Sequence, residues 1–188
     1  MSRKICVYCA SSQNVPAVYF DAAAELGAAI AAQGCELVYG GGNVGLMGCL
    51  ARAVMTNGGA VTGVIPRAMR RREWALESVN RLIETEDMHE RKSTMNRLGD
   101  GFIALPGGFG TLEEILEAIA HRQLEFHDKP CVLLNVAGFF DPLIAQFERS
   151  FAECFARPAD RAKYHVVQNV PDALDFLDQQ FNNQTASL

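Results

Sequence analysis

The chain has 188 residues and a mass of 20.5 kDa, enough for one well-buried domain. Its residues are 49% hydrophobic and 21% charged, an ordinary globular balance that excludes a disordered or fibrous protein. With 17 basic against 22 acidic residues the net charge is −5, which argues against nucleic acid as a partner. No apolar run reaches the ~18 residues of a membrane helix. The first residues enter a strand-like run without a signal peptide, so a cytoplasmic protein with no membrane partner is expected.

Six cysteines without an export signal suggest reduced thiols. Cys6 and Cys9 form a nominal C-x-x-C, but the run from Ile5 to Cys9 is typical of a strand. Residues three apart on a strand point to opposite faces, so this pair can neither chelate a metal nor easily form a disulfide. The four histidines are too scattered for a metal site. We therefore expect no metal, and the two cysteines are expected to pack in the core.

Short apolar runs alternate with longer amphipathic stretches along the chain. Strands are predicted at Ile5–Cys9, Glu36–Tyr39, Val61–Ile65, Arg81–Thr85, Phe102–Leu105, Cys131–Asn135 and His165–Val167. Helices are predicted between them at Ala17–Gln33, Leu46–Asn57, Met88–Leu98, Leu112–Leu124, Asp141–Cys154 and Ala173–Gln180. Strands that are apolar on both faces and separated by helices imply a parallel sheet with right-handed crossovers. The prediction is a three-layer, Rossmann-like α/β fold with a single domain over residues 1–181 and a flexible tail at 182–188.

Eight of the 16 glycines fall in two clusters, each directly after a predicted strand, where a parallel sheet binds its ligands. The first cluster contains G-x-G-x-x-G at Gly40, Gly42 and Gly45. The next strand ends without the carboxylate that a dinucleotide site needs, and Leu46 stands where a P-loop requires lysine. A loop for one phosphate or ribose is favoured, and a tight turn that only lets helix and strand pack is the alternative.

The second cluster, from Pro106 to Glu114, is a stronger indication of a phosphate site. Proline stiffens the exit from the strand, glycines free the backbone to surround an anion, and Thr111 offers a hydroxyl at the helix start. The alternative is structural, because Thr111 and Glu114 have the spacing of a capping box. The carboxylates of Glu113 and Glu114 would repel a phosphate bound at this loop unless other groups offset them. This tension between an anion site and two negative charges favours a functional carboxylate over a cap.

Two groups of basic residues stand out. Asp87 is predicted to cap a helix in which Arg91 and Lys92 lie near the N-terminus, where cations are unfavourable unless they face a phosphate or a carboxylate. An ordinary solvated pair is equally compatible with the spacing. A second group, Arg67 with Arg70–Arg72, is followed by Glu73; the acidic balance of the chain favours a solvated loop or a subunit contact over RNA binding.

From Cys6 to about Pro142 the sequence resembles the LOG (LONELY GUY) family, the cytokinin-activating phosphoribohydrolases once mislabelled lysine decarboxylases. The resemblance is carried by ordered motifs at compatible spacing: GGG-x-x-GLMG (Gly40–Gly48), VIP (Val64–Pro66), MHERK (Met88–Lys92), PGG-x-GT-x-x-E (Pro106–Glu114) and HDKP (His127–Pro130).

The resemblance implies an N-glycosidase that acts on (N6-substituted) adenosine 5′-monophosphates, releasing the free cytokinin or adenine base and ribose 5-phosphate. It implies no cofactor and a homodimer with the active site near the interface. The family's catalytic residues fall on Arg91 and Glu114. Its substrate contacts fall on Glu73, Arg91, Lys92, Gly107, Gly108, Phe109, Gly110, Thr111, Leu112, Glu113 and Glu114.

Two other functions stay open at this point. A non-catalytic nucleotide carrier or sensor on the same fold would bind a nucleotide without releasing its base. A housekeeping AMP nucleosidase would release adenine but show no preference for N6-substituted substrates.

Overall fold

The computed structural model describes residues 2–70 and 74–186, with side chains as far as residue 184. All strands of its single seven-stranded sheet are parallel, in the order β4-β3-β2-β1-β5-β6-β7. The strands are β1 (Lys4–Tyr8), β2 (Glu36–Tyr39), β3 (Ala60–Pro66), β4 (Arg81–Thr85), β5 (Gly101–Ala104), β6 (Cys131–Leu134) and β7 (His165–Val167). The Rossmann-like parallel sheet predicted from the sequence is confirmed.

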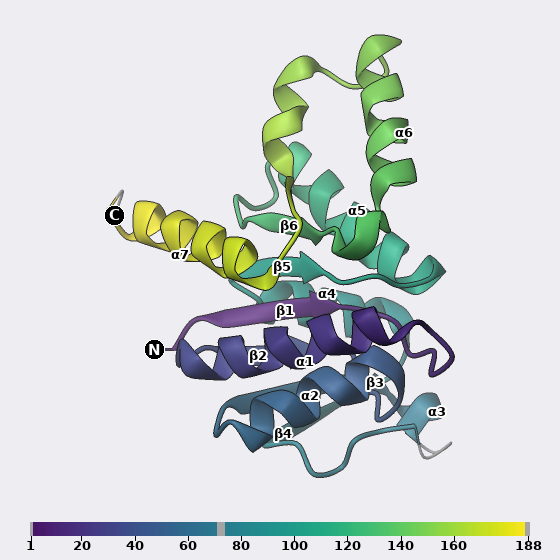
Figure 1. Cartoon of the computed structure of the whole chain (residues 1–188), viewed down its shortest axis with the longest axis vertical. Helices are drawn as coiled ribbons and strands as arrows, with labels where there is room; N and C mark the ends of the chain where they lie inside the picture. The colour runs from purple at the N-terminus through teal and green to yellow at the C-terminus, as the bar shows by residue number, and fades with distance from the viewer. Residues whose placement is uncertain (1, 71–73, 187–188) are drawn as a thin grey trace.

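Helices cover both faces of the sheet (Figure 1). They are α1 (Ala17–Ala32), α2 (Gly45–Thr56), α3 (Arg67–Arg70), α4 (Met88–Leu98), α5 (Phe109–Gln123), α6 (Asp141–Ala152) and α7 (Val170–Ala186), with short 3-10 turns at η1 (Val136–Gly138) and η2 (Pro158–Lys163). Helix α6 and the segment through η2 extend away from the sheet. Helix α7 continues into the segment 182–188 for which the sequence predicts a tail. No helix among the described residues is long and apolar enough to cross a bilayer.

The core is divided by the sheet into two clusters of buried side chains. One cluster packs α1, α2 and α7 on the first face, and the other packs α4 and α5 on the opposite face. Successive residues of β1 alternate between them, since Ile5 and Val7 belong to the first cluster and Cys6 and Tyr8 to the second. Cys9 belongs to the first cluster, so Cys6 and Cys9 lie on opposite faces of the sheet as predicted.

The strand order reverses between β1 and β5, and this reversal determines where a ligand can bind. Strands β2, β3 and β4 follow one another on one side of β1, whereas the chain crosses to the other side to form β5. In open parallel sheets the loops separate at such a switch point and leave a crevice at the carboxyl ends of the strands. Both glycine clusters follow strands at this edge.

The HDKP motif lies at the opposite edge of the sheet, directly before β6, and has a structural role there. His127 Nδ1 accepts a hydrogen bond of 3.2 Å from the backbone N–H of Lys129, and its buried Nε2 has no partner among the described residues. Burial, with the nearby Lys129 charge, lowers the pKa of His127 to about 4.

The neutral His127 ring makes the fold sensitive to acid. Between the unfolded-state pKa near 6.5 and the folded-state value of about 4, the unfolded chain binds the proton and the folded chain does not, so stability falls as pH falls through this window. We expect Tm to fall by about 2–4 °C between pH 7.5 and pH 5, the effect of about 1 kcal/mol once the ring's partial exposure is allowed for. His127→Asn keeps an acceptor for Lys129 but does not titrate. An equal loss of Tm in this variant would contradict the assignment.

Candidate active site

Three loops meet at the carboxyl edge of the sheet, next to the switch point. The loop after β1 is joined to the other two by backbone hydrogen bonds, from Ala10 N–H to the Pro106 carbonyl at 3.3 Å and from Met47 N–H to the Ala10 carbonyl at 3.2 Å. Gly45 has a φ of +61°, and a Cβ there would lie 2.4 Å from the carbonyl carbon of Ser11. Only glycine allows this approach. The two glycine clusters are therefore brought together around the end of β1.

A buried ion pair joins α4, which follows β4, to α5, which follows the second glycine loop, on the second face of the sheet. Arg91 of α4 is 5% exposed and Glu114 of α5 is 6% exposed. Arg91 Nη1 donates to Glu114 Oε1 at 2.5 Å, and Arg91 Nε donates to the Val64 carbonyl at the end of β3 at 3.1 Å. A Cβ on Gly40 would lie 2.0 Å from Arg91 Nη2, so the first glycine cluster provides the space for the guanidinium.

Two opposing influences act on the Glu114 carboxyl. Burial raises its pKa above the ordinary value, and the positive charge and hydrogen bond of Arg91 work in the other direction. Arg91 occupies Oε1. Among the described residues Oε2 accepts no hydrogen bond, although the side chain as a whole is buried. One oxygen of the carboxylate is thus held by Arg91, and the other has no donor in the described part of the chain.

The second glycine loop differs from its prediction in one respect. Helix α5 begins at Phe109 with Gly108 as N-cap, three residues before the predicted start, and no side chain in the described chain caps it. Thr111 therefore lies inside the helix, where it is buried against Gly107. The capping-box interpretation of Thr111 and Glu114 is wrong, because Thr111 is not at the cap and Glu114 pairs with Arg91.

The exposed part of this loop has the features of an anion site. Gly108, Phe109 and Gly110 are exposed, and a Cβ on either glycine would meet no atom within 4 Å. Backbone N–H groups at an uncapped helix start, together with the helix dipole, favour a negative charge. The Leu112 side chain packs toward the core, so it is the backbone of this residue that borders the loop.

Lys92 faces carboxylates on the neighbouring helix, as does Arg91. Its Nζ pairs with Glu113 Oε1 and lies 2.7 Å from Glu117 Oε2. Its hydrogen bonds to these two carboxylates raise the pKa of Lys92 above its ordinary value. Of the alternatives that the sequence left open for these two cations, the structure shows carboxylate partners for both. Asp87 caps α4 as predicted, accepting a hydrogen bond from Glu90 N–H at 2.8 Å.

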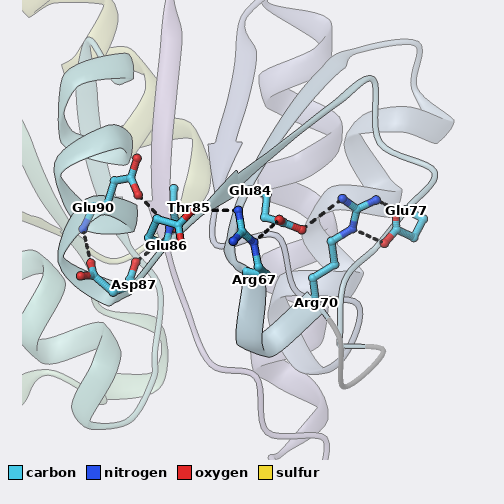
Figure 2. Close-up of polar contacts among 8 residues, drawn as sticks. All are labelled: Arg67, Arg70, Glu77, Glu84, Thr85, Glu86, Asp87 and Glu90. Atoms are coloured by element: carbon cyan, nitrogen blue, oxygen red, sulfur yellow. Dashed lines mark hydrogen bonds and ion pairs between the residues drawn. The ribbon is translucent and has the colours of Figure 1, made fainter.

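Arg67 and Arg70 of the arginine cluster lie on α3, directly after β3 at the same edge of the sheet. Arg71, Arg72 and the predicted substrate contact Glu73 are outside the described residues. Arg67 and Arg70 of α3 form ion pairs with glutamates, drawn in Figure 2. No group of three or more metal-binding side chains occurs among residues 2–70 and 74–186.

Sequence reasoning missed two parts of this site. The exposed Ser11 and Ser12 follow the central strand β1 and lie beside both glycine loops. Their position at the carboxyl end of a parallel strand, where such sheets bind ligands, is the signal that could have included them in the site. The Val64 carbonyl orients Arg91 from 27 positions away in the chain, and no local pattern indicates that contact.

Comparison with known proteins identifies the family. A family model described as "Possible lysine decarboxylase" matches residues 47–177. The chain is 50% identical to the cytokinin riboside 5′-monophosphate phosphoribohydrolase LOG of Oryza sativa subsp. japonica, covering 93% of this chain and 71% of that protein. It is 43% identical to LOG1 of Arabidopsis thaliana, which carries the same activity name, over 93% and 81% of the two chains.

Solved structures share the fold. The molybdenum cofactor carrier protein of Chlamydomonas reinhardtii is 24% identical, with a TM-score of 0.76 and coverage of 97% of this chain and 99% of that chain. The molybdenum cofactor binding protein of Rippkaea orientalis is 21% identical, with a TM-score of 0.75 over 96% and 98% of the chains. At these identities the likeness concerns the fold alone. The family model and the close relatives, which agree with the motifs at the sheet edge, show that the chain belongs to the LOG family.

Proposed function

We propose that this protein hydrolyses the N-glycosidic bond of adenosine 5′-monophosphates, with or without an N6 substituent, releasing the free base and ribose 5-phosphate. The observation that carries the proposal is the buried Arg91–Glu114 pair, which lies next to an uncapped, glycine-rich helix start. Relatives at 43–50% identity bear the name of this activity.

The reaction needs a carboxylate beside the sugar. Breaking an N-glycosidic bond develops positive charge at C1′ of the ribose, as in other glycoside hydrolysis. In the proposed mechanism Glu114 stabilises this charge and orients or deprotonates the attacking water through Oε2, the oxygen that Arg91 does not hold. Arg91 holds Oε1 and keeps the carboxylate ionised in its buried position.

The second glycine loop is proposed to bind the 5′-phosphate. The backbone from Gly107 to Thr111 and the α5 dipole would hold the dianion, so that binding energy far from the reacting atoms fixes the ribose against Glu114. Lys92 is close to the same helix and adds positive charge, while Glu113 and Glu117 orient it. Glu73 is proposed to contact the ribose or the base.

Gly108→Ala tests the phosphate role without disturbing the free protein. The residue has a φ of −87°, which alanine adopts freely, and the added methyl group meets no atom within 4 Å. We expect an unchanged Tm and a rise of about tenfold in KM, because the methyl group stands where a phosphate must approach. Inhibition by ribose 5-phosphate is expected to weaken in step, whereas inhibition by free adenine is not. A KM equal to that of the wild type would contradict phosphate binding at this loop.

A homodimer is proposed, supported by an apolar stripe along α5 that no described element covers. Phe109 and Leu116 of α5 and Leu124 at its C-cap recur seven and eight residues apart, and they are 95%, 37% and 63% exposed. Light scattering in solution tests this proposal.

The cytoplasm is proposed as the compartment, since none of the six cysteines is in a disulfide.

One product assay tests the proposed function and separates its variants. AMP, isopentenyladenosine 5′-monophosphate and the two parent nucleosides are incubated with the protein, and released base is quantified by chromatography. Base release from monophosphates but not from nucleosides is expected. A preference for AMP indicates a nucleosidase without hormone specificity. Tight binding of every monophosphate with no base release would refute the enzymatic proposal.

A further inference from the structure

Five charged residues form a continuous ladder beside the proposed active site. Glu84 of β4 accepts hydrogen bonds from two arginines of α3, at 2.8 Å from Arg67 Nε and at 3.3 Å from Arg70 Nη1. Arg67 Nη2 also lies 2.8 Å from Glu86 Oε1, and Arg70 binds both oxygens of Glu77 at 2.9 and 3.0 Å. Figure 2 shows these contacts in one row from Glu77 to Glu86, here called the charge ladder.

At one end the charge ladder is continuous with the first glycine loop. Glu77 follows the segment Trp74–Leu76, whose backbone is bonded to that loop: Asn43 N–H donates to the Trp74 carbonyl at 2.9 Å, and Leu76 N–H donates to the Gly41 carbonyl at 3.0 Å. Gly40, at the start of this loop, makes room for Arg91. The Glu77 end of the ladder therefore holds the segment that lies on the Arg91 side of the site.

At the other end the charge ladder reaches the start of α4. The backbone N–H of Glu86 donates to Glu90 Oε2 at 2.7 Å, and the N–H of Glu90 donates to the capping carboxylate of Asp87 at 2.8 Å (Figure 2). Arg91 and Lys92 directly follow Glu90 in α4. The ladder thus joins two parts of the site that are distant in sequence.

Glu84 is the central member because it is the carboxylate that both arginines share. Its backbone is fixed, since β4 is paired with β3 over five residues, whereas α3 has no buried residue to hold it in place. Arg67 and Arg70 are about half-exposed and Glu84 is about one-third exposed, so dissolved salt screens these contacts. Single exposed pairs contribute little, but a shared carboxylate couples two of them.

We propose that Glu84 is a positioning residue: through Arg67 and Arg70 it holds α3 and the segment Trp74–Leu76 against the glycine loop, and nucleotide affinity therefore falls as ionic strength rises. The part of this inference that concerns affinity rests on the proposed function. The part that concerns the position of the segment does not.

The single tryptophan of the chain, Trp74, lies in the positioned segment and is 48% exposed, so its fluorescence reports on that segment directly. Glu84→Gln keeps the shape of the side chain and removes the charge. In the ligand-free variant at low salt we expect stronger quenching of Trp74 by acrylamide than in the wild type. We also expect KM for the best monophosphate to rise about fivefold while kcat stays close to the wild-type value.

Salt provides a second test, made on the unaltered protein. Raising NaCl from about 0.05 M to about 0.5 M is expected to increase Trp74 quenching more in the wild type than in Glu84→Gln, which keeps only the Arg70–Glu77 and Arg67–Glu86 pairs. Glu153→Gln is the matched control: it breaks an exposed pair with Arg149 on α6 and is expected to behave as the wild type in every measurement.

Either an unchanged KM or unchanged Trp74 quenching in Glu84→Gln would overturn the proposal. If that variant does not fold, the wild type decides, and quenching that is independent of NaCl overturns the proposal. Absence of base release by the wild type would count against the proposed function alone, because the Trp74 measurements need no substrate.

Discussion

Glu114→Gln is expected to lower kcat by about 10³-fold, the usual effect of removing one group that stabilises charge in a transition state. Glutamine retains an oxygen that can accept the hydrogen bond from Arg91 Nη1, so the helices keep their contact. The variant loses the negative charge that is proposed to stabilise C1′. KM is expected to change little, because the phosphate loop is untouched. Base release under saturating substrate, with circular dichroism as the check on folding, measures the effect.

A second carboxylate on the same helix supplies the control for this experiment. Glu117 lies one turn along α5 and pairs with Lys92 at 2.7 Å, and Glu117→Gln removes the same charge from the same helix. Its kcat is expected to stay within about fivefold of the wild type, since a part-exposed ion pair is worth at most about 1 kcal/mol. A kcat for Glu114→Gln within about tenfold of the wild type would contradict its catalytic role.

Much of the fold could be predicted because its central strands are buried on both faces. The run Glu36–Tyr39 is short and mostly apolar, and it matches β2 residue for residue. His165–Val167 also matches β7, although this edge strand is buried only at Val167. Helix α4 also begins and ends where the sequence predicts, since Asp87 provides a capping side chain.

The errors have local causes. Helix α3 has four residues and no buried side chain, so it leaves no periodic pattern for a prediction to use. The predicted start of α5 was too late by three residues. Gly110 is a poor helix former, so the sequence gives a low helix propensity for a first turn that is helical in the structure. The start at Phe109 is accompanied by a local contact, the packing of Thr111 on Gly107.

The sequence could indicate which residues gather at this edge of the sheet but not their geometry. The tension between an anion site and two carboxylates favoured a functional Glu114, and the family resemblance implied catalytic roles for Arg91 and Glu114. Which oxygen is held, and by which nitrogen, depends on the Val64 carbonyl and on the space left by Gly40. These contacts arise only when β3, the first glycine loop and α4 come together, so single-sequence patterns carry no record of them.

Arg91→Ala is expected to abolish detectable turnover and also to destabilise the fold by about 3–5 kcal/mol, because it leaves a buried carboxylate without its partner. The loss of both properties does not by itself separate catalysis from structure. Arg91→Met combined with Glu114→Leu does, since apolar residues of similar volume often replace a buried pair without loss of stability. We expect this double variant to recover most of the lost Tm and none of the activity.

The pH dependence of Arg91→Ala provides an independent check on the pair. Without Arg91, burial acts on Glu114 with only the weaker effects of the Glu113 and Lys92 charges beside it, and its pKa in the folded state rises further above the unfolded value. The folded protein then binds a proton that the unfolded chain does not, so stability increases as pH falls through that window. As pH falls from 8 to 5.5, the difference in Tm between the wild type and Arg91→Ala is therefore expected to become smaller. The contribution of His127 is common to both proteins and cancels in this comparison. A Tm difference that is independent of pH would mean that Arg91 acts mainly through its contacts with Val64 and Gly40, not through the charge of Glu114.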